Sequence, residues 1–134
     1  MSGIKIIRAL LVADAAVLAL VPGTRIQAGI LPQGTALPYI SITSVSGVDF
    51  DVVKVGAITR VTQRIQLSVV AASYAAKKPL LTAIRSALRG RFGAFAGYQQ
   101  AVVQTDAEGP DLDVVATGFF SQSQDFKVSF NEPT

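Results

Sequence analysis

The chain has 134 residues, enough for one compact domain and too few for two, so we expect residues 1–134 to form a single domain. Only 16% of the residues are charged, against about 25% in typical soluble domains. The chain contains neither Cys nor His, which excludes disulfides and removes the commonest metal ligand and general base. A surface so short of charge favours association with neighbouring subunits; a small monomer with neutral polar groups outside is the alternative.

The net charge is +3, from 12 basic and 9 acidic residues, and the longest basic run is Lys77-Lys78. Stable binding to duplex DNA draws on about 6–10 phosphate contacts. That would place most of the cations of this chain on one face. The charge therefore disfavours a dedicated DNA-binding module and leaves a transient contact with DNA open.

Residues 4–20 carry an apolar stripe at helical spacing, which Pro22-Gly23 ends. The stripe consists of Ile4, Ile7, Leu10, Leu11, Val17, Leu18 and Val21. A secretory signal has a similar outline, but Asp14 interrupts the apolar run and no A-x-A site follows. The run is also shorter than the roughly 20 residues of a membrane span. We expect a buried amphipathic helix and no membrane partner, with the secretory reading as the alternative.

Four segments follow before the middle of the chain. Residues 25–28 form a short strand candidate. Residues 39–48 are expected to form a strand in which Ile40 and Ile42 alternate with Ser41 and Thr43, and the later half of this strand loses the alternation. Residues 47–58 have no period and are expected to form a long hairpin loop. Residues 59–71 are the clearest strand, and only Gln63 breaks its alternation. Its expected inner face consists of Val61, Ile65, Leu67, Val69 and Ala71.

A second helix is expected from an N-cap at Ser73 to about Arg89. Pro79 would remove a backbone hydrogen bond from an established helix, so regular helix is expected only from Lys78. The inward positions are Leu80, Leu81, Ile84, Ala87 and Leu88, and the outward ones are Lys78, Thr82, Arg85, Ser86 and Arg89. Glycines at 90, 93 and 97 then predict a loop.

The C-terminal third predicts strands at 100–105, 114–122 and 124–130, with an acidic turn at 106–113. In the last strand Phe126, Val128 and Phe130 face inward, and Asp125, Lys127 and Ser129 face outward. Strands joined by short turns pair antiparallel. The predicted fold is therefore α+β, a mostly antiparallel sheet with two helices packed on one face.

The candidates for chemistry are two carboxylate pairs, Asp49/Asp51 and Asp111/Asp113. Both lie in predicted loops, where hydrated aspartates ordinarily stabilise turns. Residues 89–93 lack the strand-to-helix setting and the Lys-Ser/Thr ending of a phosphate loop. We expect no catalytic residue, no metal and no cofactor.

The remaining candidates are charged. Basic side chains on the second helix, including Lys77, and on the strand at 59–71 are most simply solvated. Their functional interpretation is a subunit interface, because each subunit of a ring presents complementary surfaces to its two neighbours. The interface candidates are Arg60, Arg64, Lys78, Arg85, Arg89, Asp106, Asp111 and Asp113. Ring formation that survives charge reversal at Arg85 and Arg89 would refute this hypothesis.

Five segments of the sequence follow one another in a characteristic order. They are ALLVADAAV at 9–17, PQGTALPYI at 32–40, IQLSVVAASYA at 65–75, IRSAL at 84–88 and DFKV at 125–128. In this order the chain resembles the tail completion or tail-terminator proteins of long-tailed bacteriophages over nearly its whole length. None of the patterns is a chemical signature. The chain departs from the family at Pro79 and in the segment 47–58.

The resemblance implies a virion protein, assembled in the host cytoplasm, that forms a hexameric ring on the last ring of the tail tube. Such a ring stops tube growth and joins the tail to the head-tail connector or neck protein. The implied partners are further copies of the chain, the tail tube protein and the connector, with a transient contact to DNA in the lumen. The candidate contact loop to tube or connector contains Asp49, Phe50, Asp51 and Lys54.

Three other functions stay open at this point. A neck or connector ring protein of the same phage has a similar size and fold class. A small nucleic-acid-binding module is weakened by an aromatic content of 7% without Trp, because stacking platforms are few. An enzyme is weakened by the missing His and Cys.

Overall fold

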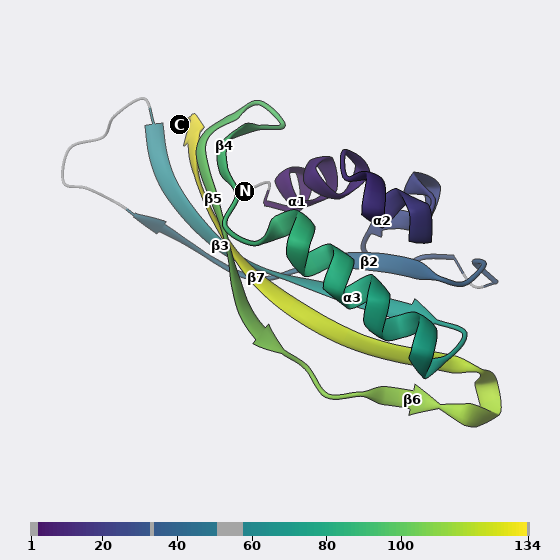
Figure 1. Ribbon diagram of the computed structural model, residues 1–134. Helices are drawn as coiled ribbons and strands as arrows, with labels where there is room; N and C mark the ends of the chain where they lie inside the picture. The colour runs from purple at the N-terminus through teal and green to yellow at the C-terminus, as the bar shows by residue number, and fades with distance from the viewer. Residues whose placement is uncertain (1–2, 33, 51–57, 134) are drawn as a thin grey trace.

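The computed structural model describes residues 3–32, 34–50 and 58–133 and shows an α+β protein built on one curved sheet (Figure 1). Its seven strands have the order β1-β2-β3-β7-β5-β4, and β6 pairs with the start of β7. Among the described strands, β1 and β2 pair in parallel, and the other pairs are antiparallel. The strands are β1 Ile26–Ala28, β2 Tyr39–Phe50, β3 Ile58–Ala71, β4 Phe92–Phe95, β5 Tyr98–Glu108, β6 Leu112–Val114 and β7 Phe119–Pro133. The predicted α+β class and antiparallel sheet are confirmed.

The described chain has three α-helices, where two were predicted: α1 Gly3–Val12, α2 Ala15–Leu20 and α3 Tyr74–Leu88. Two 3₁₀ turns, η1 Gly23–Arg25 and η2 Val115–Thr117, complete it. The single helix predicted for residues 4–20 is wrong because the chain breaks at Asp14. This side chain caps α2, its Oδ1 accepting from the backbone N–H of Val17 at 3.1 Å. An aspartate that starts a new helix satisfies an otherwise unpaired N–H.

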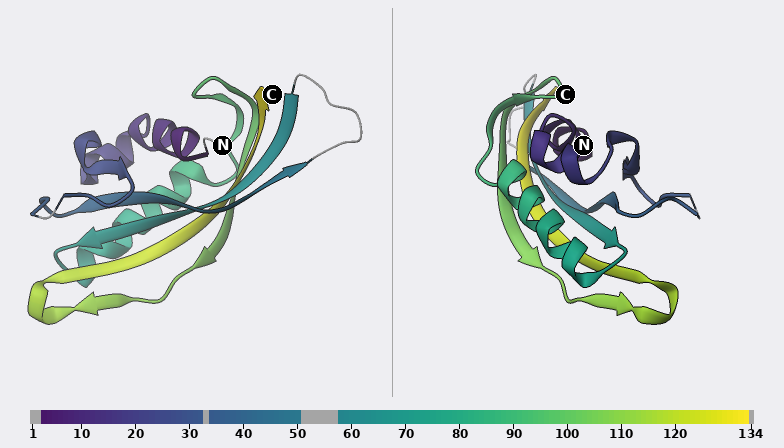
Figure 2. Two further views of the ribbon diagram at one scale, coloured as in Figure 1. Left: turned by 180° about the vertical axis from the view of Figure 1, so that it is seen from behind. Right: turned by 45° about the vertical axis from the view of Figure 1, so that its right-hand side comes forward.

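The hydrophobic core lies between the helices and the sheet, which curves around them (Figure 2). Every second residue of β3 from Val61 to Ala71 is buried, as predicted, and Gln63 occupies one of these inner positions. Its Oε1 accepts from the backbone N–H of Gly3 at 2.6 Å, which attaches the start of α1 to β3. The predicted inward residues of the last strand and of α3 are also buried. They are Phe126, Val128, Phe130, Leu80, Leu81, Ile84, Ala87 and Leu88.

The loop predicted for residues 47–58 is wrong in its first part. Residues 47–50 belong to β2 and pair with residues 63–60 of β3, beyond a bulge between Ser44 and Ser46. The alternation is lost there because residues 43–49 are exposed on both faces of β2, so no face selects apolar residues. Residues 51–57 of the predicted loop lie outside the described residues.

The helix α3 starts at Tyr74, four residues before the predicted Lys78. The Ser73 Oγ accepts from the N–H of Ala76 at 3.1 Å, and the N–H of Lys77 bonds the Ser73 carbonyl. This predicted N-cap is therefore confirmed, and it stabilises the first turn. Pro79 lies inside the helix and removes one backbone bond that the remaining turns outweigh.

Three further boundaries differ from the prediction. Residues 90–97, predicted as loop, contain β4, whose Gly93 has a φ of 149° that favours glycine. The acidic turn predicted at 106–113 shrinks to residues 109–111, because β5 continues to Glu108 and β6 starts at Leu112. Residues 114–130, predicted as two strands, divide instead into the end of β6, the turn η2 and the long strand β7.

Candidate functional site

The charged candidates on α3 and after β5 form a cluster within one chain. We call Lys77, Asp111 and Asp113 the Lys77 cluster. The Lys77 Nζ lies 2.7 Å from Asp111 Oδ1 and 2.8 Å from Asp113 Oδ1, and its side chain has no exposed surface. It also lies 4.7 Å from the centre of the Tyr74 ring. The expectation that Lys77 belongs to an outward basic face is therefore wrong, because two carboxylates and an aromatic ring enclose its ammonium group.

Electrostatics keep Lys77 and Asp111 ionised at neutral pH. Burial lowers the pKa of Lys77, but hydrogen bonds to Asp111 and Asp113 outweigh it and hold this pKa above its ordinary value. Hydrogen bonds from Lys77 and then Lys78 lower the pKa of Asp111. The Lys78 Nζ lies 3.2 Å from Asp111 Oδ1 and 2.7 Å from Gln122 Oε1. The cluster thus attaches the segment between β5 and β7 to the first turns of α3.

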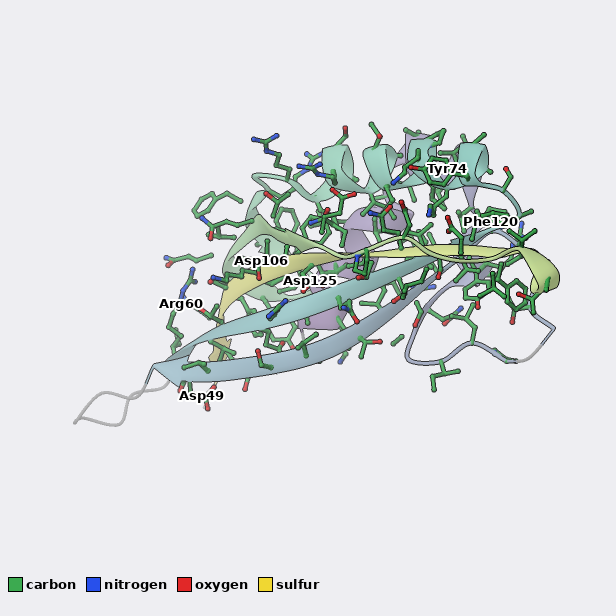
Figure 3. The ribbon with its side chains drawn as sticks, turned by 90° about the horizontal axis from the view of Figure 1, so that it is seen from below. Asp49, Arg60, Tyr74, Asp106, Phe120 and Asp125 are labelled. Atoms are coloured by element: carbon green, nitrogen blue, oxygen red, sulfur yellow. The ribbon has the colours of Figure 1, made fainter. Side chains whose placement is uncertain are left out.

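A second cluster lies across three neighbouring strands. We call Arg64 on β3, Asp125 on β7 and Asp106 on β5 the Arg64 cluster. The Arg64 guanidinium donates to Asp125 Oδ2 through Nη2 and through Nε at 2.9 Å, and its Nε lies 3.5 Å from Asp106 Oδ2. Hydrogen bonding to Asp125 is the main cause that raises the pKa of Arg64. Figure 3 shows Asp106 and Asp125 beside each other.

Asp125 lies on the outward face of β7, as predicted, opposite the outward Gln66 of β3. It is nevertheless only 3% exposed, because Arg64 covers it. Its Oδ1 is buried and has no hydrogen-bond partner within the described part of the chain. Pattern analysis missed Asp125 as a partner of Arg64, since the two residues are 61 positions apart.

The other basic candidates are placed differently. The Arg60 guanidinium donates to the Gln100 carbonyl at 2.6 Å and to Asn131 Oδ1 at 3.1 Å, so it caps the end of three strands. Arg85 on α3 and Arg89, the residue directly after α3, are exposed, as predicted, and form no ion pair with another described residue. Both cations are therefore available to a second molecule.

The candidate contact loop is only partly described. Asp49 is exposed on β2, and Phe50 is the last residue of that strand. Asp51 and Lys54 lie outside the described residues. The interface and contact roles of all these residues therefore remain predictions.

An open sheet edge was missed by the sequence analysis. The short strand β1 pairs with β2 only at residues 40–42, so residues 43–50 have no partner on the side away from β3 among the described strands. We call this segment the free β2 edge. Its Val45 and Val48 are 49% and 60% exposed. The only signal in the sequence was the loss of alternation at 44–48, which fits a strand with both faces uncovered.

No group of three or more His, Cys, Asp and Glu side chains among the described residues could hold a metal ion. Among the same residues, no helix has the length and apolar character needed to cross a membrane.

Comparisons with known proteins identify the family of this chain. No curated protein matches the chain. A chain of a solved structure, described as "Virion of native gene transfer agent (GTA) particle", superposes with a TM-score of 0.69 at 19% identity, covering 94% of this chain and 92% of that chain. At this identity the likeness shows a shared fold. The family model of the tail completion protein gp17 matches residues 5–124. The chain therefore belongs to the tail completion protein gp17 family and is a structural protein of the bacteriophage virion.

Proposed function

We propose that residues 1–134 act as one domain and that copies of this chain form a hexameric ring on the head-proximal end of the tail tube. The ring stops tube growth and joins the tail to the head-tail connector. Membership of the tail completion family supports the place in the tail. A neck ring one layer nearer the head is the second candidate, because it would need the same size and the same lateral contacts.

The free β2 edge is the observation that carries this proposal. This eight-residue segment has outward-pointing backbone groups without a partner among the described strands, and it has two exposed valines, so it would promote aggregation of a lone molecule. Proteins that remain monomeric cover such an edge or block it with Lys or Pro. Residues 43–50 contain neither Lys nor Pro, and no described strand covers them on this side. A neighbouring subunit that covers the free β2 edge would prevent this aggregation and provide a lateral contact in the ring.

The two ends of the curved sheet differ chemically, as a cap requires. In Figures 1 and 2 the end of β2 and the start of β3 lie far from β6. Asp49 and Phe50, the last residues of β2, lie at the first end, and the remaining contact candidates Asp51 and Lys54 follow them in the sequence outside the described residues. The second end exposes Leu112, Val114, Val115 and Phe119. A terminator must bind the tube at one end and present an opposite end that no further tube subunit fits.

The outward residues of β3 suit a surface past which DNA moves. They are polar and half-buried: Thr62, Arg64, Gln66 and Ser68. The charge of Arg64 is balanced by Asp125 and Asp106. A nearly neutral polar face would contact DNA in the lumen transiently and without the salt-sensitive binding of a basic patch.

Two measurements test the proposed function. Light scattering of the purified chain gives the mass of the assembly; a ring has several times the 14.0 kDa of one chain, and a strict monomer at all concentrations contradicts the proposal. Electron microscopy of particles made without this protein then separates the candidates. Overlong tails support termination, tails of normal length that fail to join heads support the neck ring, and normal joined tails remove both.

A further inference from the structure

A second strand edge is open on the opposite margin of the sheet. The pairing between β4 and β5 covers residues 98–102, and Val103 exchanges backbone hydrogen bonds with Gly90 and Arg91. Beyond this point, residues 104–108 pair only with β7, and their other side has no strand partner in the described part of the chain. We call residues 104–108 the free β5 edge.

The two free edges border the same part of the sheet. Ser46 on β2 lies opposite Arg64 on β3, Arg64 lies opposite Lys127 on β7, and Lys127 lies opposite Gln104 on β5. These four residues form one row across a strip of four strands. At that level each margin of the strip is a free edge, and Figure 3 shows Asp49 and Asp106 on opposite margins.

The strand directions allow one copy to continue the strip of the next. Because β2, β3, β7 and β5 are successively antiparallel, β2 and β5 run in opposite directions. A rotation about a ring axis preserves strand direction relative to that axis. The β5 of a neighbour therefore meets β2 in antiparallel orientation, in which both edges can form a regular ladder.

We propose that the free β2 edge of each copy pairs antiparallel with the free β5 edge of the next copy, so that one sheet continues around the ring. This inference rests on the proposed ring and names its lateral contact. The two edges are different, as a closed head-to-tail ring requires. Residues 43–50 contain no Lys and no Pro, the residues that ordinarily block strand addition.

The charges along the two edges favour the same pairing. A hollow beside the free β5 edge is lined by Arg89 and Lys127, whereas the free β2 edge carries the exposed carboxylate of Asp49. The acidic side chains of the free β5 edge already have partners in their own chain. Asp106 contacts Arg64, and Glu108 accepts from Gln122 Nε2 at 2.7 Å. Their charges therefore do not repel Asp49 without compensation.

Cysteine cross-linking tests the pairing directly, because the chain has no native Cys. One variant carries Ser46→Cys and Gln104→Cys, two positions on the same face of the strip. The control carries Ser46→Cys and Thr105→Cys; Thr105 lies opposite Phe126 and so on the other face. A short bis-maleimide can join two cysteines that lie directly or diagonally opposite each other on paired strands. We expect it to link the cysteine introduced at position 46 of one copy to that at position 104 of the next and so to produce a series of covalent multimers. The control remains largely uncross-linked.

The outcomes separate this inference from the proposed ring. Light scattering that shows monomers for the unmodified chain overturns both. If rings form but the Ser46→Cys/Gln104→Cys variant gives no covalent multimers, the edge pairing alone is overturned. Covalent dimers from the single variant Ser46→Cys also overturn it, because they place two copies of the same edge together.

A second variant keeps the test independent of cross-linking. Val48→Lys places a charge on the free β2 edge, at a side chain that is 60% exposed, so the fold should be retained. Ile30→Lys is the matched control at a 99% exposed position after β1. We expect Val48→Lys to yield folded monomers and Ile30→Lys to keep the ring. Rings of unchanged mass from both variants would overturn the proposal.

Discussion

Replacing Lys77 by methionine isolates the energetic role of the Lys77 cluster. Methionine retains most of the aliphatic volume of the lysine stem and removes the ammonium group that binds Asp111 and Asp113. The Lys77 side chain has no exposed surface, whereas those of Asp111 and Asp113 are 41% and 24% exposed. Once released, both carboxylates can therefore regain part of their hydration.

These exposures set the expected magnitude. Removing one partner of a fully buried ion pair costs about 3–5 kcal/mol. Here the stranded partners are partly hydrated, so we expect the free energy of unfolding to fall by about 2 kcal/mol for Lys77→Met. For a chain of this length the melting temperature should fall by roughly 6–10 °C.

The pH dependence gives a second readout with a definite sign. The pKa of Asp111 is lowered in the folded chain, so its stabilising contribution is present above its ordinary pKa of 3.8 and is lost as the pH falls through its folded pKa. The pKa of Lys77 is raised, so its contribution is present below 10.5 and is lost at higher pH. The variant Lys77→Met should show a weaker loss of stability in both ranges than the parent chain.

Chemical denaturation at pH 7, at pH 3 and above pH 10.5, followed by circular dichroism, measures the stability at neutral pH and its loss in both ranges. The matched control is Lys78→Met, which removes an ammonium group that also contacts Asp111 but whose side chain is 38% exposed. We expect a smaller effect from this control. Equal stability of Lys77→Met and the parent chain at pH 7 would refute the reasoning, because the buried ammonium would then contribute nothing beyond its carbon stem.

Three further changes test the core, a helix cap and the candidate interface. Phe126→Ala should lower the free energy of unfolding by about 3–5 kcal/mol in urea denaturation, because the ring is fully buried; a loss below that of an exposed site would contradict this core. Ser73→Ala should cost about 1 kcal/mol in the same assay, through loss of the bond to the N–H of Ala76, and Ser73→Asp should restore it. The double change Arg85→Glu and Arg89→Glu should weaken the ring in light scattering while leaving the fold intact; an unchanged ring would remove these arginines from the interface.

Local patterns in the sequence were sufficient to predict the parts of the fold that have one buried face. The alternation of β3 and the helical spacing of α3 were both correct, because each inner position meets the core and each outer one meets water. Asp14 was noticed as unusual within the apolar run. Its effect, a break between α1 and α2, depends on a side chain to backbone bond that periodicity does not encode.

Local patterns do not predict the segments in which burial does not alternate. Residues 47–50 form a strand that is exposed on both faces, so the pairing with β3 rather than an apolar pattern defines it. Strand pairing is a contact between residues that are distant in the sequence, so the sequence of one strand does not show which strand it pairs with. The free β2 edge is therefore visible only in the assembled sheet, as is the free β5 edge opposite to it.

The contacts between charged side chains could not be predicted from the sequence. Composition determined that the chain has few charges and neither Cys nor His, and the order of its segments pointed to a tail protein. Only the tertiary structure decided which charges meet. Lys77 is buried against aspartates 34 and 36 residues away, and Arg64 binds an aspartate 61 residues away, whereas Arg85 and Arg89 stay exposed. Ion pairs act over a few ångströms in space, and the distance between two residues in space follows from the packing of the sheet and helices rather than from their spacing along the chain.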